Sequence, residues 1–460
     1  MNKLKISELV FALSGELLNG NLDFLIDNVS IDSRNVNASS LFIAIVGEVH
    51  DAHDFISSAY DNGCRTFVVS KRDCFFKDDM NLILVDDTKK AYGNIAKYYR
   101  DKFSIDIIGI TGSTGKTTVK DMVYGVLSTK YKTLKNLQNL NNEIGVPKTL
   151  LRLDDTYSKA IIEMGMQKKG EIKYLRDIVR PKIGIITKIG TAHIEFFDNQ
   201  DGIFNAKMEI ADGFDEDNIL IVNGDDSYLK RLKEKNHLYK LYTYGFDSDN
   251  DLYCKSFSIS DVARFTCVYK GNSYDFMIPS PAKHNVLNAM AAIMVGFLLD
   301  IPYELIKNGL SCYEASNNRM DIFKIHDMLI INDSYNANYD SMVAMLLVLA
   351  NYTTRKVAIL GDMLELGDKS TALHQDVAKS FLDNKIDVLV TVGEESKVID
   401  DYVISHGFAK NMVFHFSNVS DLLDKIDGIV EDTDAILIKG SNGIGLSKVA
   451  EYFKEKVSDE

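Results

Sequence analysis

Short apolar runs alternate with stretches of helical periodicity along most of the chain. Between residues 103 and 320 the apolar runs are Ile105–Ile110, Ala160–Met164, Ile183–Lys188 and Ile219–Val222. Runs of this kind are typical of buried strands, and their alternation with helices predicts a mostly parallel sheet with helices on both faces. The segment Leu241–Met277 lacks this alternation and predicts antiparallel strands and hairpins.

The same pattern continues on both sides of this region. The N-terminal part predicts three strands and then a helix: Ser40–Val46, Thr66–Val69, Leu82–Val85 and Thr88–Lys102. The C-terminal part predicts a further series of strands at residues 327–332, Lys356–Leu360, Asp387–Val392 and Ala435–Ile438. A length of 460 residues agrees with about three domains. We therefore predict a three-domain α/β protein with domains at 1–100, 101–325 and 326–460, the third being Rossmann-like.

The composition is that of a globular protein, with 46% hydrophobic and 26% charged residues. A net charge of -14 argues against a nucleic-acid partner, because such partners require a basic surface. The five cysteines form no C-x-x-C pair, which indicates reduced thiols rather than disulfides or a zinc site. No run approaches the roughly 20 apolar residues of a membrane span, and the N-terminus does not resemble a secretory signal. We therefore expect a cytoplasmic protein.

The segment Asp106–Lys120 reads DIIGITGSTGKTTVK, an apolar run followed by a small-residue loop and a predicted helix. Loop N–H groups and a helix N-terminus attract phosphate, and Lys116 can reach the outer phosphates. The Thr117 hydroxyl can ligate Mg²⁺. The usual phosphate-loop pattern has glycine where this chain has Ile110. We interpret the segment as a nucleotide-binding loop, and the alternative is a glycine-rich turn with an incidental lysine.

Two predicted strands end in candidate metal ligands. The sequence IIEMG places Glu163 at the carboxyl end of one strand, where a carboxylate can bind Mg²⁺. The sequence IITKIGTAH brings His193 to the same edge of the sheet. With Thr117 these residues predict a site for one or two divalent ions that bridge ATP phosphates. Taken singly, the glutamate could be a surface residue and the histidine a structural one.

Two other polar features are open to two interpretations each. Residues 136–147 read NLQNLNNEIGVP, which is consistent with Asx turns in a polar loop or with part of a site. The sequence AKMEI places Lys207 in a predicted helix, where a lysine is either solvated or functional.

Taken together, these segments resemble the Mur ligase family. The resemblance covers nearly the whole chain, and the blocks YNAN and GDMLELG match the branch that joins D-alanyl-D-alanine to UDP-N-acetylmuramoyl-tripeptide. The matching segments, in order, are DSRNV, LFIAIVGEVHDAHDF, TGSTGKTT, NLNNEIGVP, EMG, TKIGTAH, AKMEI, KHNVLNAMAA, NRMD, DSYNANYDSM, LGDMLELG with His374, and IKGSNGIGL.

The resemblance implies an ATP-dependent ligase that forms an amide bond through an acyl phosphate. It implies a uridine-nucleotide domain, a central ATPase domain and a C-terminal domain that swings onto the central one, for which we expect a hinge near 322–332. The implied cofactors are ATP and two Mg²⁺, and the implied partners are UDP-N-acetylmuramoyl-tripeptide and D-alanyl-D-alanine. The third residue of that tripeptide, lysine or diaminopimelate, stays open. We expect a monomer.

The resemblance also implies roles for single residues. Those implied for ATP are Thr111, Gly112, Ser113, Thr114, Gly115, Lys116, Thr117, Thr118, His284, Asn285, Asn288, Arg319, Asp333 and Asn336. Those implied for Mg²⁺ are Thr117, Glu163, His193 and Lys207, and in several relatives the matching lysine is carbamylated by CO₂. Those implied for catalysis are Lys116, Asn142, His193 and Lys207. Those implied for the other substrates are Ser33, Arg34, Asn139, Asn142, Tyr335 and Asn338.

The chain departs from the family pattern at three further positions, where Ala52 replaces a glycine, Tyr339 a proline and Asn442 an arginine. The alternatives are a neighbouring Mur ligase, a folylpolyglutamate synthase, a P-loop kinase, or a binding protein that has kept the fold without catalysis. The first 100 residues disfavour the folate enzyme, and the C-terminal motifs disfavour a kinase.

Overall fold

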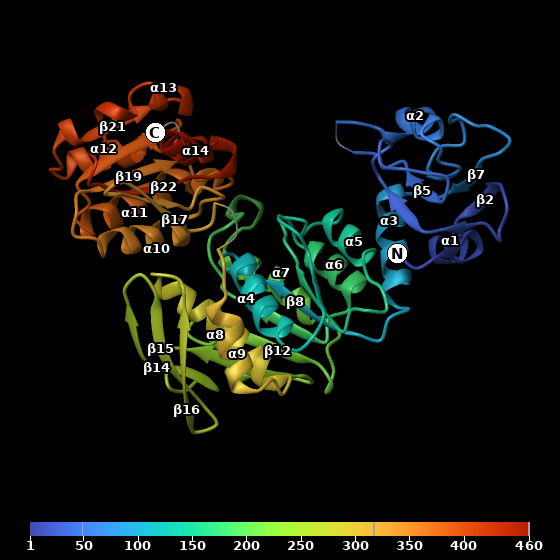
Figure 1. The fold of residues 1–460 in the computed structure, drawn as a ribbon, viewed down its shortest axis with the longest axis horizontal. Helices are drawn as coiled ribbons and strands as arrows, with labels where there is room; N and C mark the ends of the chain where they lie inside the picture. The colour runs from blue at the N-terminus through green and yellow to red at the C-terminus, as the bar shows by residue number, and fades with distance from the viewer. Residues whose placement is uncertain (48, 316–317, 459–460) are drawn as a thin grey trace.

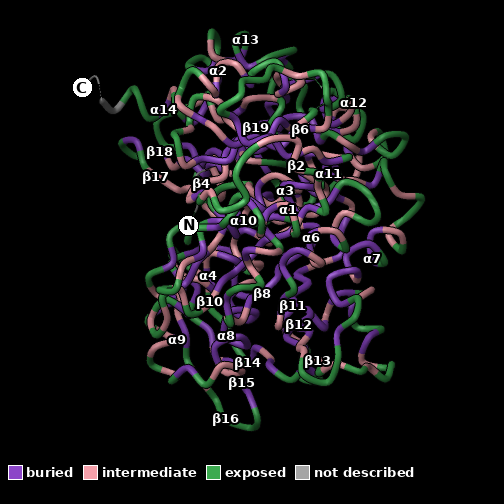
Figure 2. The backbone as a smooth tube through the Cα atoms, turned by 90° about the vertical axis from the view of Figure 1, so that its right-hand side faces the viewer, coloured by how far each residue is buried: buried purple, intermediate pink, exposed green. Residues whose placement is uncertain are grey.

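The computed structural model describes residues 1–47, 49–315 and 318–458, and it contains three main β-sheets. The N-terminal and C-terminal sheets lie on opposite sides of the central part (Figure 1). Strands of the central sheet are buried while many connecting loops are exposed (Figure 2). The predicted α/β class is confirmed, and the predicted strands are present with small shifts at their ends.

The N-terminal sheet has five strands in the order β2-β7-β6-β5-β4. Only β2 is antiparallel to its neighbour. The strands are β2 (Glu16–Asn19), β4 (Asn28–Ser30), β5 (Ser40–Ile43), β6 (Thr66–Val69) and β7 (Asn81–Leu84), and the helices are α1 (Ile6–Leu13) and α2 (Ile56–Asp61). A separate pair, β1 (Leu4–Lys5) and β3 (Leu25–Ile26), completes this part.

Helix α3 (Thr88–Arg100) joins the N-terminal sheet to the central one. Asp87 caps its first turn by accepting from the N–H groups of Lys89 and Lys90. The helix packs on α5 (Gly145–Leu150) and α6 (Glu171–Val179) of the central part. Near its end, the Tyr99 hydroxyl donates to the Leu153 carbonyl at 2.7 Å. The whole length of the helix is therefore fixed to the central domain.

The central sheet has nine strands in the order β16-β15-β14-β13-β12-β11-β8-β10-β9. On one face, Ile108 and Ile110 pack against helices α4 and α8, and on the other Ile107 packs toward α3 and α6. Burial on both faces explains the unbroken apolar runs. The elements of the parallel part are β8 (Asp106–Thr111), α4 (Lys116–Ser128), β9 (Thr133–Lys135), β10 (Lys159–Glu163), β11 (Ile183–Ile186), α7 (Gln200–Met208), β12 (Ile219–Asn223), α8 (Lys283–Leu298) and α9 (Tyr303–Ser311).

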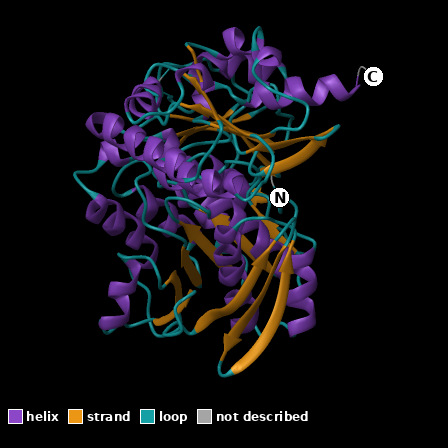
Figure 3. Cartoon of the chain, turned by 90° about the vertical axis from the view of Figure 1, so that its left-hand side faces the viewer, coloured by secondary structure: helices purple, strands orange, loops and turns teal. Residues whose placement is uncertain are grey.

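The segment predicted to be antiparallel is only partly so. Strands β14 (Leu252–Ile259), β15 (Ala263–Tyr269) and β16 (Asn272–Ile278) form an antiparallel arm, which extends beyond the helices in Figure 3. Strand β13 (Lys240–Gly245), however, is parallel to both β12 and β14, so the prediction is wrong there. The connection that contains the 3-10 turn at Leu229–Glu234 returns the chain so that β13 runs parallel to β12, and β14 pairs with the end of β13 through Tyr244 and Gly245.

The C-terminal sheet has six strands in the order β17-β18-β22-β19-β20-β21. It begins with an antiparallel hairpin of β17 (Asp321–Ile325) and β18 (Met328–Asn332), ahead of the predicted domain start at residue 326. The predicted hinge at 322–332 is therefore wrong, because those residues form a regular hairpin within the sheet. The other elements are α10 (Tyr339–Ala350), β19 (Lys356–Gly361), α11 (Ser370–Asp383), β20 (Val388–Val392), α12 (Lys397–Ser405), β21 (Val413–Phe416), α13 (Val419–Leu423), β22 (Ala435–Lys439) and α14 (Ser447–Ser458).

The connection between α9 and β17 is irregular. Its described residues, 312–315 and 318–320, carry no helix or strand. Asn318 and Met320 adopt positive φ angles of 60° and 54°.

Across the described residues, no helix combines the length and apolar character that spanning a membrane requires.

Candidate active site

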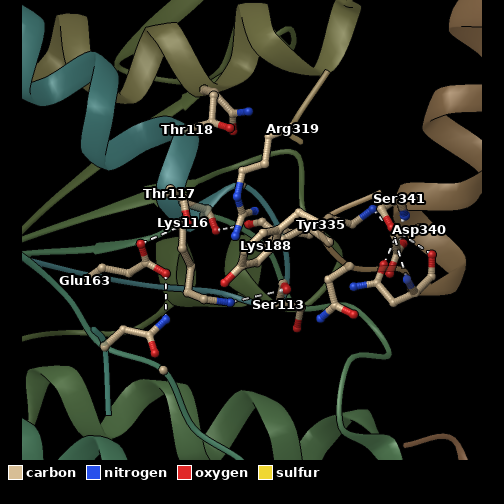
Figure 4. A pocket seen from close by; sticks show the side chains of 18 of the residues that line it. Ser113, Lys116, Thr117, Thr118, Glu163, Lys188, Arg319, Tyr335, Asp340 and Ser341 are labelled. Atoms are coloured by element: carbon tan, nitrogen blue, oxygen red, sulfur yellow. Dashed lines mark hydrogen bonds and ion pairs between the residues drawn. The ribbon is translucent and has the colours of Figure 1, made fainter. Parts of the chain in front are cut away.

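A cavity of about 1400 Å³ lies where the three parts of the chain meet. Its wall includes the loop between β8 and α4, the start of α3, the start of α8, and the segment that leads into α10. Figure 4 shows the side chains at its centre, with Lys116, Thr117 and Glu163 on one side and Asp340 and Ser341 on the other.

The loop between β8 and α4 has the geometry of a phosphate-binding loop. Gly112 and Gly115 have φ angles of 152° and 79°. A Cβ atom at Gly112 would lie 1.9 Å from the Thr187 hydroxyl, and one at Gly115 would lie 2.7 Å from Asn288 Oδ1. Ile110, the departure from the usual pattern, is a buried residue of strand β8 that precedes the loop. The structure therefore needs glycine at 112 and 115 but not at 110.

Lys116 turns back over its own loop. Its ammonium group donates to the Gly112 carbonyl at 2.7 Å. Burial lowers the pKa of Lys116 below its ordinary value, and the nearby charge of Arg319 lowers it further. An anion in the loop would replace that carbonyl as the partner of the ammonium group and supply the missing negative charge.

The Glu163 carboxylate is the centre of a buried network. It accepts from the Thr117 hydroxyl at 2.9 Å and from the Asn141 amide at 2.8 Å. Its backbone N–H donates to Asn136 Oδ1 at 2.9 Å, and Asn136 returns a bond to its carbonyl. Burial alone would raise the pKa of Glu163, but the charges of Lys120, Lys116 and Arg319 outweigh burial and hold it below its ordinary value.

In the asparagine-rich segment 136–147, the residues that bind Glu163 are not the two that were predicted to belong to the site. Asn136 and Asn141 hold Glu163, whereas Asn142 accepts from the N–H of Gly145, the first residue of α5, at 2.9 Å. Asn139 is exposed. Both Asn139 and Asn142 nevertheless line the cavity, so their assignment to substrate stays a prediction.

The donor set near the phosphate loop fits Mg²⁺. The Thr117 hydroxyl and the Glu163 carboxylate are oxygen ligands of the kind that Mg²⁺ prefers. No group of three or more His, Cys, Asp or Glu side chains in the described part of the chain is arranged to hold a metal. Mg²⁺ commonly binds through one or two protein oxygens together with substrate phosphates and water, so the smaller set is sufficient.

The two other predicted metal ligands have different surroundings. His193, with a positive φ of 61°, lies with Nδ1 2.5 Å from the Glu365 carboxylate of the C-terminal domain. Lys207 is buried in α7 and has no hydrogen-bond or ion-pair partner among the described residues. Burial lowers the pKa of Lys207 well below its ordinary value, and the charge of Lys116 adds to the effect. Burial therefore favours the neutral form of the Lys207 amine.

The predicted residues of α8 form the opposite wall of the phosphate loop. The Asn288 amide donates to Asn285 Oδ1 at 2.9 Å, and Asn285 in turn donates to the Ser280 hydroxyl at 2.8 Å. Burial lowers the pKa of His284 to about 4, so this ring is neutral near pH 7. All three residues line the cavity.

The C-terminal residues gather around a buried lysine that was not among the predicted site residues. Lys439 lies 2.5 Å from Asp333 Oδ2 and donates to the Asn336 carbonyl at 2.9 Å. The Arg319 guanidinium stacks on the Tyr335 ring, 3.9 Å from its centroid. Asn338 is engaged as the cap of α10, accepting from the Ser341 N–H at 3.0 Å. All of the residues named here line the cavity.

The two predicted residues of the N-terminal domain lie outside the cavity wall. Arg34 is exposed and makes a bidentate pair with Asp32, whose pKa it lowers to about 2. The N-terminal contribution to the wall comes instead from Asp87, Lys89 and Lys90 at the start of α3. The assignment of Ser33 and Arg34 to the uridine nucleotide stays a prediction.

Three residues that join the central and C-terminal domains were also missed. Lys188 pairs with Asp340, and Glu365 pairs with His193 and accepts from the Gln167 amide at 3.1 Å. Lys188, Asp340 and Glu365 all lie inside segments that carry the family resemblance. Their pairing could not be predicted, because one sequence does not show which residues far apart in the chain come into contact.

Three family models match the chain, one in each of its three parts. Residues 25–100 match the model "Mur ligase family, catalytic domain", residues 110–296 match "Mur ligase middle domain", and residues 318–442 match "Mur ligase, glutamate ligase domain". The UDP-N-acetylmuramoyl-tripeptide--D-alanyl-D-alanine ligase of Bacillus subtilis is 35% identical over 98% of both chains.

Solved structures agree with this match. A crystal structure of MurF from Acinetobacter baumannii is 28% identical, covers 99% of both chains and has a TM-score of 0.92. The MurF ligase of Thermotoga maritima in complex with ADP shares the fold, with 22% identity, coverage of 94% of this chain and 98% of that one, and a TM-score of 0.83. The chain belongs to the Mur ligase family.

Proposed function

We propose that this protein joins D-alanyl-D-alanine to UDP-N-acetylmuramoyl-tripeptide at the expense of ATP. The single observation that carries the proposal is the end-to-end similarity to a ligase of that name, over 98% of both chains. The cavity supports it, because its wall combines a phosphate loop with segments of the N-terminal and C-terminal domains. A reaction of three substrates needs such a meeting point.

The reaction runs in two steps. The tripeptide carboxylate attacks the γ-phosphorus of ATP, ADP leaves, and an acyl phosphate remains. The dipeptide amine then attacks the acyl carbon, loses a proton and expels phosphate, which leaves an amide bond. Holding the reactants together can contribute roughly 7–11 kcal/mol to lowering the barrier.

The protein's own groups have distinct parts in these steps. The loop amides from Gly112 to Thr117 and the Lys116 ammonium hold the phosphates. Thr117 and Glu163 would hold one Mg²⁺, and His193 a second. Bound Mg²⁺ would neutralise charge on the transferring phosphoryl group. Closing the C-terminal domain over the cavity excludes water, which would otherwise hydrolyse the acyl phosphate.

Lys207 is the residue that we propose to be carbamylated. Carbamate formation needs a neutral amine that attacks CO₂ and releases a proton. Burial favours the neutral amine, and the product is an anion that the neighbouring positive charge of Lys116 would stabilise. Mass spectrometry under native conditions with ¹³C-labelled bicarbonate tests this, because a carbamate adds the mass of CO₂ at Lys207.

Phosphate release from ATP and Mg²⁺, measured with UDP-N-acetylmuramoyl-tripeptide and with or without D-alanyl-D-alanine, tests the proposed function. The expected result is release that depends on the dipeptide, with a UDP-pentapeptide detected by mass spectrometry. Parallel tripeptides ending in lysine or diaminopimelate identify the accepted third residue. Turnover with single amino acids or folates, and none with the dipeptide, would contradict the proposal.

Thr117→Val provides a variant and Thr129→Val its matched control. Thr117 bonds to Glu163, whereas Thr129 lies at the other end of the same helix and bonds to the Val126 carbonyl at 2.7 Å. We expect loss of dipeptide-dependent phosphate release in the first and normal release in the second.

A further inference from the structure

Lys120 forms an ion pair in a position where ion pairs are rarely stabilising. Its Nζ lies 3.4 Å from Glu163 Oε2, and the two side chains are only 2% and 1% exposed. Removing two charges from water costs more than such a pair usually returns. The pair therefore needs an explanation beyond stability, and it lies at the proposed metal site.

The contacts of Lys120 are few and long. Besides Glu163, the hydrogen-bond partner of its ammonium group among the described residues is the Gln138 carbonyl, also at 3.4 Å. Glu163, by contrast, is held at both carboxylate oxygens by Thr117 and Asn141 at 2.9 and 2.8 Å. The carboxylate is thus fixed by neutral donors, while the lysine supplies charge without a tight bond.

We propose that Lys120 is a positioning residue that acts as the resident counter-ion of Glu163, keeping this buried carboxylate charged and in place until Mg²⁺ arrives. The inference rests on the proposed role of Glu163 in binding Mg²⁺. The ammonium group and a Mg²⁺ ion bound by Glu163 would neutralise the same carboxylate, so the two compete. Lys120 therefore stabilises the metal-free protein and weakens the binding of Mg²⁺.

These two effects have opposite signs, and that separates the proposal from a merely structural role. Without the Lys120 charge, the buried Glu163 anion keeps only the charges of Lys116 and Arg319 and loses the largest of the three, so the metal-free protein should be less stable. The same change removes a positive charge next to the metal, so Mg²⁺ should bind more tightly. A lysine that only packs would lower stability on replacement without strengthening Mg²⁺ binding.

The experiment uses the full chain with Lys120→Met, which keeps the length of the side chain and removes its charge. Melting temperature is measured with ADP present at fixed concentration while Mg²⁺ is titrated. We expect a melting temperature several degrees below that of the wild type without Mg²⁺, and a Mg²⁺ midpoint that falls roughly tenfold. These readouts require no turnover, so they remain informative even if the proposed substrates are wrong.

Two controls keep the result specific. Lys120→Arg retains the charge and should keep both quantities near the wild-type values. Lys135 lies on strand β9 and pairs at 2.7 Å with Asp121, which is on the same helix as Lys120. Lys135→Met removes this lysine charge instead of the one paired with Glu163, so it should leave the Mg²⁺ midpoint unchanged.

The double variant Lys120→Met with Glu163→Gln covers the case in which Lys120→Met does not fold. It replaces the ion pair by two neutral side chains of similar size, so the proposal expects it to fold and to be more stable than Lys120→Met without Mg²⁺. A double variant that is no more stable would overturn the proposal. So would a Mg²⁺ midpoint in Lys120→Met that is unchanged or raised.

Discussion

The Lys188 ammonium, just after strand β11, lies 2.7 Å from the Asp340 carboxylate at the start of α10 in the C-terminal domain. Asp340 also accepts from the Thr191 N–H at 3.3 Å. The loop that carries Lys188 is bound to the phosphate loop as well, because the Ser113 N–H donates to the Lys188 carbonyl at 2.8 Å. The loop after β11 therefore contacts both the phosphate-binding loop and the C-terminal domain.

Asp340→Asn should weaken the docking of the C-terminal domain. Because the pair is partly exposed, its contribution is at most about 1 kcal/mol, and we expect KM for D-alanyl-D-alanine to rise about two- to fivefold. Steady-state kinetics at saturating ATP measures this. Lys188→Met should have a similar effect, and the double variant should be no worse than either single one.

Asp376→Asn is the matched control for that prediction. Asp376 pairs with Lys379 at 2.7 Å on the surface of the same domain, without contact to the central part. An equal rise in KM for Asp376→Asn would mean that general charge, and not the pair with Lys188, matters.

Gly115→Ala should nearly abolish the use of ATP. The substitution places a Cβ 2.7 Å from Asn288 Oδ1 and forces a non-glycine residue to a φ of 79°. Gly271→Ala imposes nearly the same φ, 78°, but meets nothing within 4 Å, so it isolates the cost of the backbone conformation alone. We expect at least about a 100-fold loss of kcat/KM for ATP in the first and little change in the second.

Lys207→Met should raise stability while it removes activity. In protein kept free of CO₂, so that Lys207 is a free amine, its pKa is lower in the folded than in the unfolded chain, and stability therefore rises with pH. Methionine removes this cost, and its stabilising effect should shrink as the pH approaches 10. We expect a higher melting temperature at pH 7 and a loss of activity of at least about 100-fold. An unchanged rate would contradict the proposed role of Lys207.

Asp400 should make the C-terminal domain sensitive to pH. Burial raises the pKa of Asp400 to about 7, although it accepts from the Thr391 hydroxyl and faces His415 and Lys397. The folded state then keeps a proton that the unfolded state releases, so stability falls as the pH rises from about 4 to about 7. Burial also lowers the pKa of His415 below its ordinary value, which favours the neutral ring.

Asp400→Asn mimics the protonated carboxyl and provides the test. We expect it to be more stable than the wild type at pH 8 by on the order of 2–4 kcal/mol, and similar to it at pH 4. Urea unfolding at both values measures the difference. A stabilisation that is equal at the two values would show that Asp400 does not titrate in this range.

Much of the fold was predictable, because strands buried on both faces produce unbroken apolar runs such as Ile107, Ile108 and Ile110. Strand β13 was misassigned because direction depends on where the chain crosses back, and an apolar run carries no sign of direction. Strand β17 was missed for another reason. Its apolar pattern is weaker than that of its partner β18, so the sheet was predicted to begin at β18.

The candidate site also contains features that the sequence could predict and contacts that it could not. The phosphate loop and Glu163 are local features, readable from spacing, and both line the cavity. Which asparagine of NLQNLNNEIGVP reaches Glu163 depends on the turn that the segment makes, and the structure selects Asn136 and Asn141. The contact between Lys188 and Asp340 depends on how two domains dock, which no local pattern records.

Helix α3 packs on α5 and α6, so the N-terminal sheet is joined to the central domain through a packed helix. The C-terminal domain instead meets the central domain through side chains such as Lys188 and Asp340. Its share of the cavity wall, which includes Asp333, Tyr335 and Lys439, is in place only while that domain is docked. We therefore expect the dipeptide to bind last.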